Sequence, residues 1–333
     1  MVYYSKNFEK IINEIDKTKL KGKVGIKVHF GEEGNETFLS PHHAKKVYDK
    51  VISLGYEASL IECNVLYRGS RTTKKDHINV AKKHGFDFAE IDILDGNKGE
   101  KNLELSINDG SVSKAHVGKG VERYDSLIVL SHFKGHVASG FGGAFKNLGM
   151  GLGSRSGKLH MHSDVSPNIS KSKCVACKEC IRNCDFDAIK LINKKAEIDE
   201  NLCSGCAMCI AVCKYNAVNV PWGGSSNEEL QKKIIDYSKA LIDYFDENII
   251  YINALKNITK DCDCMGRKMK PIMEDVGYLI SEDPVSIEKA SLDLVNEKSD
   301  NYFDSISSPN NMFKINYAQK QNLGKIDYKL KHI

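Results

Sequence analysis

Eight of the eleven cysteines in this 333-residue chain fall into two copies of one spacing, C-x2-C-x2-C-x3-C. The first copy is Cys174, Cys177, Cys180 and Cys184, and the second is Cys203, Cys206, Cys209 and Cys213. Each cysteine of the second copy follows its counterpart by 29 positions. Because thiolates with this spacing on a tight loop converge on the corners of an iron–sulfur cubane, we expect each copy to supply three ligands to one [4Fe–4S] cluster.

The fourth cysteine of each copy decides how the two clusters share their ligands. In two-cluster ferredoxins it crosses over to the other cluster. On that pattern one cluster takes Cys174, Cys177, Cys180 and Cys213, and the other takes Cys203, Cys206, Cys209 and Cys184. Two structural zinc sites are the alternative, but zinc has no use for a third cysteine two residues further on in each run.

Length, charge and the N-terminal residues limit the class of protein. At 333 residues and 41% hydrophobic composition, the chain is long enough for about two domains. The net charge of +4 and the absence of a long basic run give no case for binding nucleic acid. The first six residues lack the apolar stretch of an export signal, and no window has the length of a membrane span. We therefore expect a cytoplasmic protein, in which cysteines serve as metal ligands before disulfides.

Apolar and amphipathic segments alternate along the chain and define its fold class. Strand-like segments are expected at residues 23–30, 58–61, 88–93, 126–130 and 248–252, and helices at 41–54, 77–84, 228–245 and 285–296. Nearly continuous apolar strands between such helices indicate an α/β fold, a mixed or parallel sheet with helices on both faces. We expect a discontinuous α/β domain (1–168 and 224–333) and an inserted α+β ferredoxin-like domain (169–223). A separate C-terminal domain is the alternative.

A glycine-rich segment, residues 131–157, directly follows the strand at 126–130. Ligands of α/β proteins bind at the carboxyl ends of the strands, and glycines permit positive φ and close approach of the backbone to a ligand. The segment and its flank contain side chains suited to an anionic substrate. We predict catalytic roles for His132, His136 and Lys146, and substrate binding by Lys134, Asn147, Ser154 and Arg155. A mobile linker is the alternative, but the interleaved Phe141 and Phe145 indicate packing.

Other residues outside the cysteine runs are secondary candidates. His160 and His162 would face one way if their segment were extended. Cys262 and Cys264, separated by one residue, either hold an additional soft metal ion, form an exposed redox pair, or lie together by coincidence. Cys63 follows a strand and is a packed thiol or a wall of the same cleft. His29, which ends the first strand, is equally a capping or a catalytic residue.

The chain resembles the domain-of-unknown-function 362 (DUF362) family over nearly its whole length. The resemblance rests on segments 27–35 (KVHFGEEGN), 62–71, 131–158 and 280–296, on CDCMG at 262–266, and on the inserted cysteine runs. It implies an α/β domain with a two-cluster insertion. More remotely, HVASGFGGAFKNLG (136–149) is similar to the glycine/lysine loop of the nickel-pincer lactate racemases, which implies that His132, His136 and Lys146 contact a substrate or cofactor.

These patterns lead to one functional hypothesis and two alternatives. We expect an iron–sulfur oxidoreductase that relays electrons through two [4Fe–4S] clusters to a small anionic substrate or a second cofactor in the glycine-rich cleft. A non-catalytic electron carrier or a metal-delivery or maturation protein, which works with a redox partner protein, is the first alternative. An isomerase with structural clusters is the second.

Overall fold

A computed structural model describes residues 1–15, 20–246, 248–307 and 309–333. Its main sheet has eight strands in the order β16-β1-β15-β14-β7-β2-β3-β4. The bounds of these strands are β1 (Val2–Ser5), β2 (Lys23–Lys27), β3 (Glu57–Glu62), β4 (Ile91–Ile93), β7 (Ser126–His132), β14 (Ile249–Leu255), β15 (Gly277–Ser281) and β16 (Leu330–His332). The predicted α/β class with a mixed sheet is confirmed.

The strand directions show where the sheet changes its winding. Strands β14, β7, β2, β3 and β4 run parallel to one another, whereas β15 is antiparallel to both β14 and β1. The chain runs outward from β2 through β3 to β4, and then returns to place β7 on the other side of β2. The boundary between β2 and β7 is therefore a topological switch point, where α/β proteins open a crevice at the carboxyl ends of the strands.

Helices cover both faces of the sheet. One face packs against α1 (Phe8–Asn13), α2 (Pro41–Ser53) and α3 (Lys74–Lys83), and the other against α7 (Asn227–Tyr244), α8 (Pro284–Lys298) and α10 (Asn311–Lys320). A hydrophobic core lies on each face of the sheet, and alternate residues of β7 point into the two cores. Leu127 and Val129 belong to one core, and Ile128 and Leu130 belong to the other. This two-sided burial explains the nearly continuous apolar strands.

The remaining elements of the α/β part lie around this frame. They are β5 (Asn102–Ser106), β6 (Lys114–Gly118), η2 (Lys119–Arg123), β8 (Lys134–His136), β9 (Gly140–Gly142), η3 (Lys146–Met150), α4 (Arg155–His162) and α9 (Tyr302–Ser305). Strand β14 lies between β15 and β7, so the C-terminal strands belong to the main sheet and form no sheet of their own. The division into a discontinuous α/β domain (1–168 and 224–333) and an inserted domain (169–223) stays a prediction.

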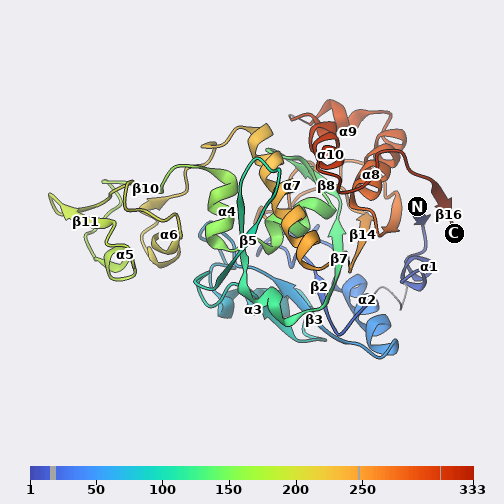
Figure 1. Cartoon of the computed structure of the whole chain (residues 1–333), viewed down its shortest axis with the longest axis horizontal. Helices are drawn as coiled ribbons and strands as arrows, with labels where there is room; N and C mark the ends of the chain where they lie inside the picture. Colours follow the sequence, from blue (N-terminus) through green and yellow to red (C-terminus); the bar gives the residue numbers. More distant parts are fainter. Residues whose placement is uncertain (16–19, 247, 308) are drawn as a thin grey trace.

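The cysteine-rich part of the chain protrudes from one side of the molecule, away from the two termini (Figure 1). It contains β10 (Asn168–Ile169), α5 (Glu179–Arg182), β11 (Ile189–Ile192), β12 (Lys195–Ile198), α6 (Met208–Val212) and β13 (Val218–Asn219). Strands β10 and β13 pair with each other, as do β11 and β12. None of these strands joins the main sheet.

Local sequence accounts for most element boundaries, and two differ from expectation. Helix α2 begins after Ser40, whose side chain accepts from His42 N–H, and Pro41 occupies the first turn. Helix α3 begins at Lys74, three residues before the predicted start, because Thr73 caps Asp76 N–H. Strand β2 ends at Lys27, although the apolar pattern continues to Phe30; beyond the strand, Val28 and Phe30 pack in the core and His29 borders the crevice.

Candidate functional site

The two cysteine runs fold as structural repeats. Left-handed backbone at Ala176 and Lys178 in the first run recurs at Gly205 and Ala207 in the second, again 29 positions on. Short helices, α5 and α6, then begin at the residue after Lys178 and after Ala207. Such turns reverse the chain between successive cysteines and direct their side chains toward a common point.

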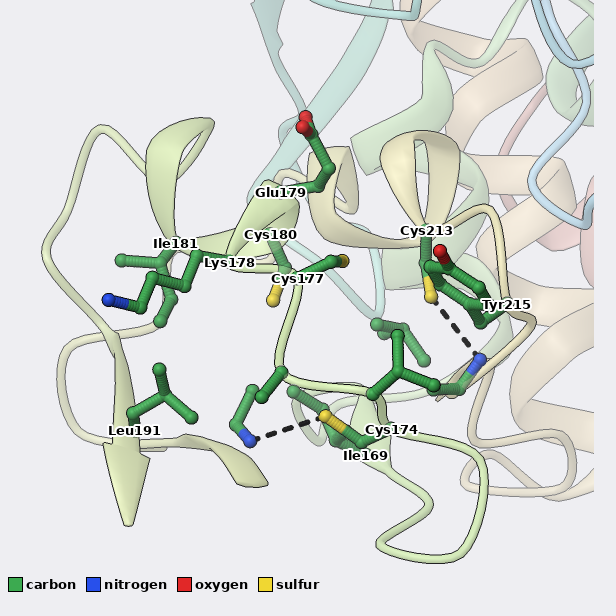
Figure 2. A pocket seen from close by; sticks show the side chains of 15 residues that line it. Ile169, Cys174, Cys177, Lys178, Glu179, Cys180, Ile181, Leu191, Cys213 and Tyr215 are labelled. Carbon is green, nitrogen blue, oxygen red and sulfur yellow. Dashed lines mark hydrogen bonds between the residues drawn. The ribbon is translucent and has the colours of Figure 1, made fainter. Parts of the chain in front are cut away.

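Each run, with one cysteine from the other, lines a small apolar pocket. The first pocket is bordered by Cys174, Cys177, Cys180 and Cys213 (Figure 2). The second is bordered by Cys184, Cys203, Cys206 and Cys209. These are the two crossed sets expected from the ferredoxin pattern. The remaining lining is largely aliphatic, including Ile169 and Leu191 in the first pocket and Ile189 and Ile198 in the second.

Hydrogen bonds from the backbone and the burial of the cysteine sulfurs are both compatible with an iron–sulfur cluster in each pocket. Ala196 N–H donates to Cys174 Sγ at 3.4 Å, and Ala217 N–H donates to Cys213 Sγ at 3.3 Å. Donors of this kind stabilise sulfur that carries negative charge. Burial raises the pKa of the Cys180 and Cys203 thiols, so their ionisation depends on a bound cation. Among the described residues, no group of three or more His, Cys, Asp or Glu side chains is arranged to hold a single metal ion.

Besides the two sulfur-lined pockets, a larger cavity of about 500 Å³ lies in the α/β part at the switch point. Lys27 from the end of β2, Glu62 from the end of β3 and Lys134 just after β7 all border it. Trp222 and Gly223, where the chain leaves the cysteine-rich part, border it as well. We call it the switch-point cavity. Its position follows the rule for open α/β sheets, and its volume is in the range of small-molecule sites.

Buried ion pairs form its floor. Lys27 Nζ lies 3.0 Å from Glu62 Oε1, and Arg71 Nε lies 3.1 Å from Glu32 Oε2. Burial lowers the pKa of Lys27 to about 8, against the opposing charge of Glu62. Lys27 also donates to Asn147 Oδ1 at 2.8 Å, which fixes the amide of a predicted substrate-binding residue. The pairs hold the floor rigid because each buried charge requires its partner.

The cavity has more cationic than anionic side chains. Lys27, Arg71, Lys134, Lys146 and Lys158 border it, whereas Glu62 is the carboxylate on its lining. Glu62, Glu32 and Asp263 pair with Lys27, Arg71 and Lys134. In the described parts of the chain, Lys146 and Lys158 have no carboxylate partner. Lys158 instead donates to the carbonyl oxygens of Gly153 and Gly151. The excess of two cations suits an anionic ligand.

The glycine-rich segment forms a wall of the cavity by close packing more than by unusual backbone. Of its predicted turn glycines, Gly140 has a positive φ (73°), and the others do not. At Gly149 a Cβ would lie 2.3 Å from Ile234 O on α7, and at Gly157 a Cβ would lie 2.1 Å from His116 O. These glycines let η3 and α4 approach neighbouring backbone. The expectation that glycines of this segment adopt a positive φ holds at Gly140 alone among those of residues 131–157.

Lys146 is the first residue of the π-helical turn η3. Across the cavity it faces Cys262 and Cys264, which we call the C-x-C pair. Its Nζ lies 3.4 Å from Cys262 Sγ. Cys262 and Cys264 both border the cavity. A hydrogen bond from the Cys264 thiol and the charges of Lys146 and Lys134 outweigh burial and hold the pKa of Cys262 well below its ordinary value. The same bond and burial raise the pKa of Cys264.

The four predicted histidines divide between cavity and core. His136 borders the cavity, and its Nδ1 accepts from Ala138 and Ser139 N–H at 3.2 and 3.0 Å. Burial and Lys146 lower its pKa, so the neutral ring carries its proton on Nε2. His162 also borders the cavity, whereas His160 lies 2.9 Å from Tyr237 OH. They face apart because their segment is helical, contrary to the extended alternative.

Three predicted site residues lie away from the cavity lining. Both ring nitrogens of His132 are engaged, with Asp263 Oδ2 at 2.8 Å and Lys256 O at 2.7 Å. Ser154 caps α4 by accepting from Gly157 N–H. Arg155 donates to the carbonyl oxygens of Lys98, Leu66 and Thr72. Each of the three holds a segment beside the cavity and does not border it, so their contact with a substrate stays a prediction.

Several lining residues were not among the predicted site residues. Lys27 and Glu62 were missed, although a charged residue inside an apolar strand, as in KVGIKVHF, is a usable signal. Cys63, expected as a packed thiol or a wall of the cleft, and His29, expected as a capping or a catalytic residue, do line it, as do Tyr67 and Arg71. His29 Nδ1 lies 3.2 Å from Glu62 Oε2 and from Arg71 Nη1. The buried Cys63 thiol donates to Leu152 O at 3.4 Å.

The fold and these two sites define an α/β protein with a cysteine-rich insertion. The chain belongs to the DUF362 family, described as a domain of unknown function, which matches residues 24–293. No curated protein matches the chain. In the part of the chain that is described, no helix is both long and apolar enough to cross a membrane.

Two solved structures show a distant likeness. The lactate racemase apoprotein from Thermoanaerobacterium thermosaccharolyticum has 15% identity and a TM-score of 0.39, over 76% of this chain and 50% of that one. A Thermotoga maritima protein solved by a structural genomics consortium has 12% identity and a TM-score of 0.40, over 75% of this chain and 51% of that one. The chain thus spans about half the length of each.

Proposed function

We propose that this chain is an iron–sulfur oxidoreductase that binds two [4Fe–4S] clusters and acts on an anionic substrate or second cofactor in the switch-point cavity. The observation that carries the proposal is the division of eight cysteines into two pockets of four, with Cys213 and Cys184 exchanged between the runs. When bound, such clusters supply one electron each at a potential set by burial and by N–H···S bonds.

The cysteine-rich part is tied to the cavity by two consecutive residues. Arg68 donates to the carbonyl oxygen of Cys213, and Tyr67 OH lies 3.2 Å from Cys264 O and 2.8 Å from Glu32 Oε2. Tyr67 also borders the cavity. A ligand of the first pocket and the C-x-C pair are thus joined through neighbouring side chains, which supports a shared redox role.

Within the cavity, side chains have separate tasks in this proposal. Lys146 and Lys158 attract and orient the anionic group, because they are the cations without a carboxylate partner in the described residues. Asn147 is held by Lys27 and by Leu130 O, so its position is fixed before a ligand enters. His136 is neutral with a proton on Nε2, and it donates a hydrogen bond from this nitrogen to the bound anion.

An anaerobic titration with dithionite tests the redox claim. Stepwise bleaching of the visible absorption band, followed by its return on addition of an oxidant, is expected. A spectrum that does not respond to the reductant contradicts the proposal. Lys146→Met is expected to leave the bleaching intact, because Lys146 lies in the cavity and not among the cluster ligands.

A non-catalytic carrier or maturation protein is the second candidate, and exposed apolar side chains favour it. Val175, Phe186, Leu202 and Tyr215, all in the cysteine-rich part, are 46 to 56% exposed. Such side chains suit contact with a redox partner protein. Capture from anaerobic lysate separates the two candidates: a retained small anion without a partner favours the enzyme, and a stoichiometric partner favours the carrier.

A further inference from the structure

The residues around the C-x-C pair place both thiols on one side of their segment. Cys262 and Cys264 border the cavity, whereas Asp263 between them faces the interior, where its Oδ2 lies 2.8 Å from His132 Nδ1 and 3.3 Å from Lys134 Nζ. Residues 262–265 form a turn, in which Met265 N–H donates to Cys262 O at 3.0 Å. The bonds of Asp263 to His132 and Lys134 anchor this turn on its buried side, while both sulfur-bearing residues border the cavity.

The two sulfurs differ in their surroundings and so in their roles. Lys146 Nζ lies 3.4 Å from Cys262 Sγ, and a hydrogen bond from the Cys264 thiol together with this ammonium group lowers the pKa of Cys262, which favours its thiolate form. The same hydrogen bond and burial raise the pKa of Cys264, which favours its thiol form. A thiolate is the nucleophile in disulfide exchange, and a neighbouring thiol resolves the mixed disulfide that forms. The pair therefore has an attacking sulfur and a resolving sulfur in place.

We propose that Cys262 and Cys264 form a dithiol–disulfide couple that exchanges two electrons with a small anionic disulfide bound in the switch-point cavity. The Cys262 thiolate attacks one sulfur of the small disulfide; its S–S bond breaks and the first thiolate leaves. Cys264 then loses its proton and attacks Cys262 Sγ, which releases the second thiolate. One protein thiolate and one protein thiol are oxidised and one small disulfide is reduced. The proton lost by Cys264 passes to one released thiolate, and the other takes up a proton from water.

The local charge favours this couple over a metal site. Lys146 beside Cys262, with Lys134 and Arg71 close by, opposes a cation at the sulfurs. A disulfide across one intervening residue is strained, and strained disulfides are the oxidising, labile ones that serve catalysis. The anionic class follows from Lys146 and Lys158, which leave positive charge at the place where the small molecule would bind.

The inference rests on the proposed function for the role of the cavity as a redox site, but the thiol exchange itself needs no cluster. Its test uses the anaerobic protein as isolated, oxidised glutathione as the probe, and iodoacetamide as the quench. Cleavage after Lys260 and Arg267 yields a peptide that contains only these two cysteines. We expect this peptide to lose two hydrogens and resist alkylation, with two glutathione thiols released for each disulfide consumed. A peptide that remains fully alkylated overturns the proposal.

Single substitutions test which cysteine attacks the small disulfide and which one resolves the mixed disulfide. Cys264→Ser is expected to trap glutathione on Cys262, whereas Cys262→Ser is expected to trap none. Lys146→Met should slow the reaction at neutral pH by about tenfold, the effect of one pKa unit on the thiolate fraction. A neutral disulfide, hydroxyethyl disulfide, should react more slowly than the anionic probe. Equal rates for the two probes contradict the anionic class.

The same samples separate this inference from the proposed function. If the peptide is oxidised in protein that contains neither iron nor sulfide, the cluster proposal fails and the thiol couple stands. If the clusters are present and respond to dithionite while the peptide stays reduced, the thiol couple fails alone. A stoichiometric copper or zinc ion that is lost in Cys262→Ser also overturns the couple.

Discussion

The ammonium nitrogen of Lys146 lies 3.4 Å from the sulfur of Cys262, although 116 residues separate them in the chain. The glycine-rich segment and the C-x-C segment therefore face each other across one cavity. The pairing also stabilises both charges: burial opposes the ammonium form of Lys146, but Cys262 more than compensates and raises the pKa of Lys146. A lysine that stays charged in a buried wall is suited to hold an anion.

The crossed sharing of cysteines can be tested with two single substitutions. Cys213→Ser should impair the cluster of the Cys174 run and leave that of the Cys203 run, and Cys184→Ser should do the opposite. Each variant should lose about half of its iron, since each pocket holds one four-iron cluster. Iron analysis of anaerobic protein, with paramagnetic resonance of the reduced form, provides the measurement.

Cys63→Ser is the control for that experiment, because Cys63 is a buried cysteine that borders neither sulfur-lined pocket. It should retain all its iron. If Cys213→Ser and Cys184→Ser give the same residual spectrum, the crossed assignment is wrong.

Glu62→Gln should destabilise the fold by about 3 kcal/mol, because it leaves the ammonium group of Lys27 buried without its partner. Adding Lys27→Met should restore part of the lost stability, since no unpaired charge then remains. Urea unfolding monitored by circular dichroism measures both effects. Glu90→Gln removes an exposed pair with Lys23 (3.5 Å) and should cost less than about 1 kcal/mol. Equal losses for Glu62→Gln and Glu90→Gln would contradict the buried pair.

Gly149→Ala should lower the free energy of unfolding by about 1–3 kcal/mol, because the added methyl meets Ile234 O and Ser238 Oγ where η3 packs on α7. Gly142→Ala is the comparison, since its nearest neighbours lie 3.3 Å or more away and are flexible ends of lysine side chains. It should cost clearly less. If the segment were a loose linker, both substitutions would be tolerated alike.

Acid should weaken the fold through His162. Burial, together with the charges of Lys146 and Lys158, lowers the pKa of His162 to about 4. Because the unfolded chain takes up this proton near pH 6.5 and the folded chain does not, the stabilisation is complete above pH 6.5 and is lost as the pH falls toward 4. The loss is up to about 3 kcal/mol, at 1.4 kcal/mol for each pKa unit. His162→Gln should flatten the dependence of the unfolding free energy in this window; an unchanged slope argues against a neutral, buried ring.

The sequence predicted those features that neighbouring residues determine, namely the cysteine pockets, the buried strands and the starts of helices. The spacing of the cysteines led to the two crossed pockets, because turns with left-handed residues at fixed offsets repeat within a few positions. Apolar runs such as SLIVL predicted strands buried on both faces, and β7 is completely buried. The helix caps Ser40 and Asp283 act as their residue types suggest.

Residue roles that depend on distant partners were not predictable in this way. His132 and His136 look alike in the sequence, but Asp263, 131 residues beyond His132, engages one ring and not the other. Arg155 is drawn to carbonyl groups of residues 66, 72 and 98, which no local pattern reveals. The approach of Lys146 to Cys262 likewise depends on the register of β14 beside β7, which brings the two segments to one end of the sheet.

The most direct test of the central claim is chemical analysis of protein purified without oxygen. The proposal requires about eight iron atoms and eight acid-labile sulfides per chain, as two [4Fe–4S] clusters contain. Zinc in place of iron, with no labile sulfide, would contradict it.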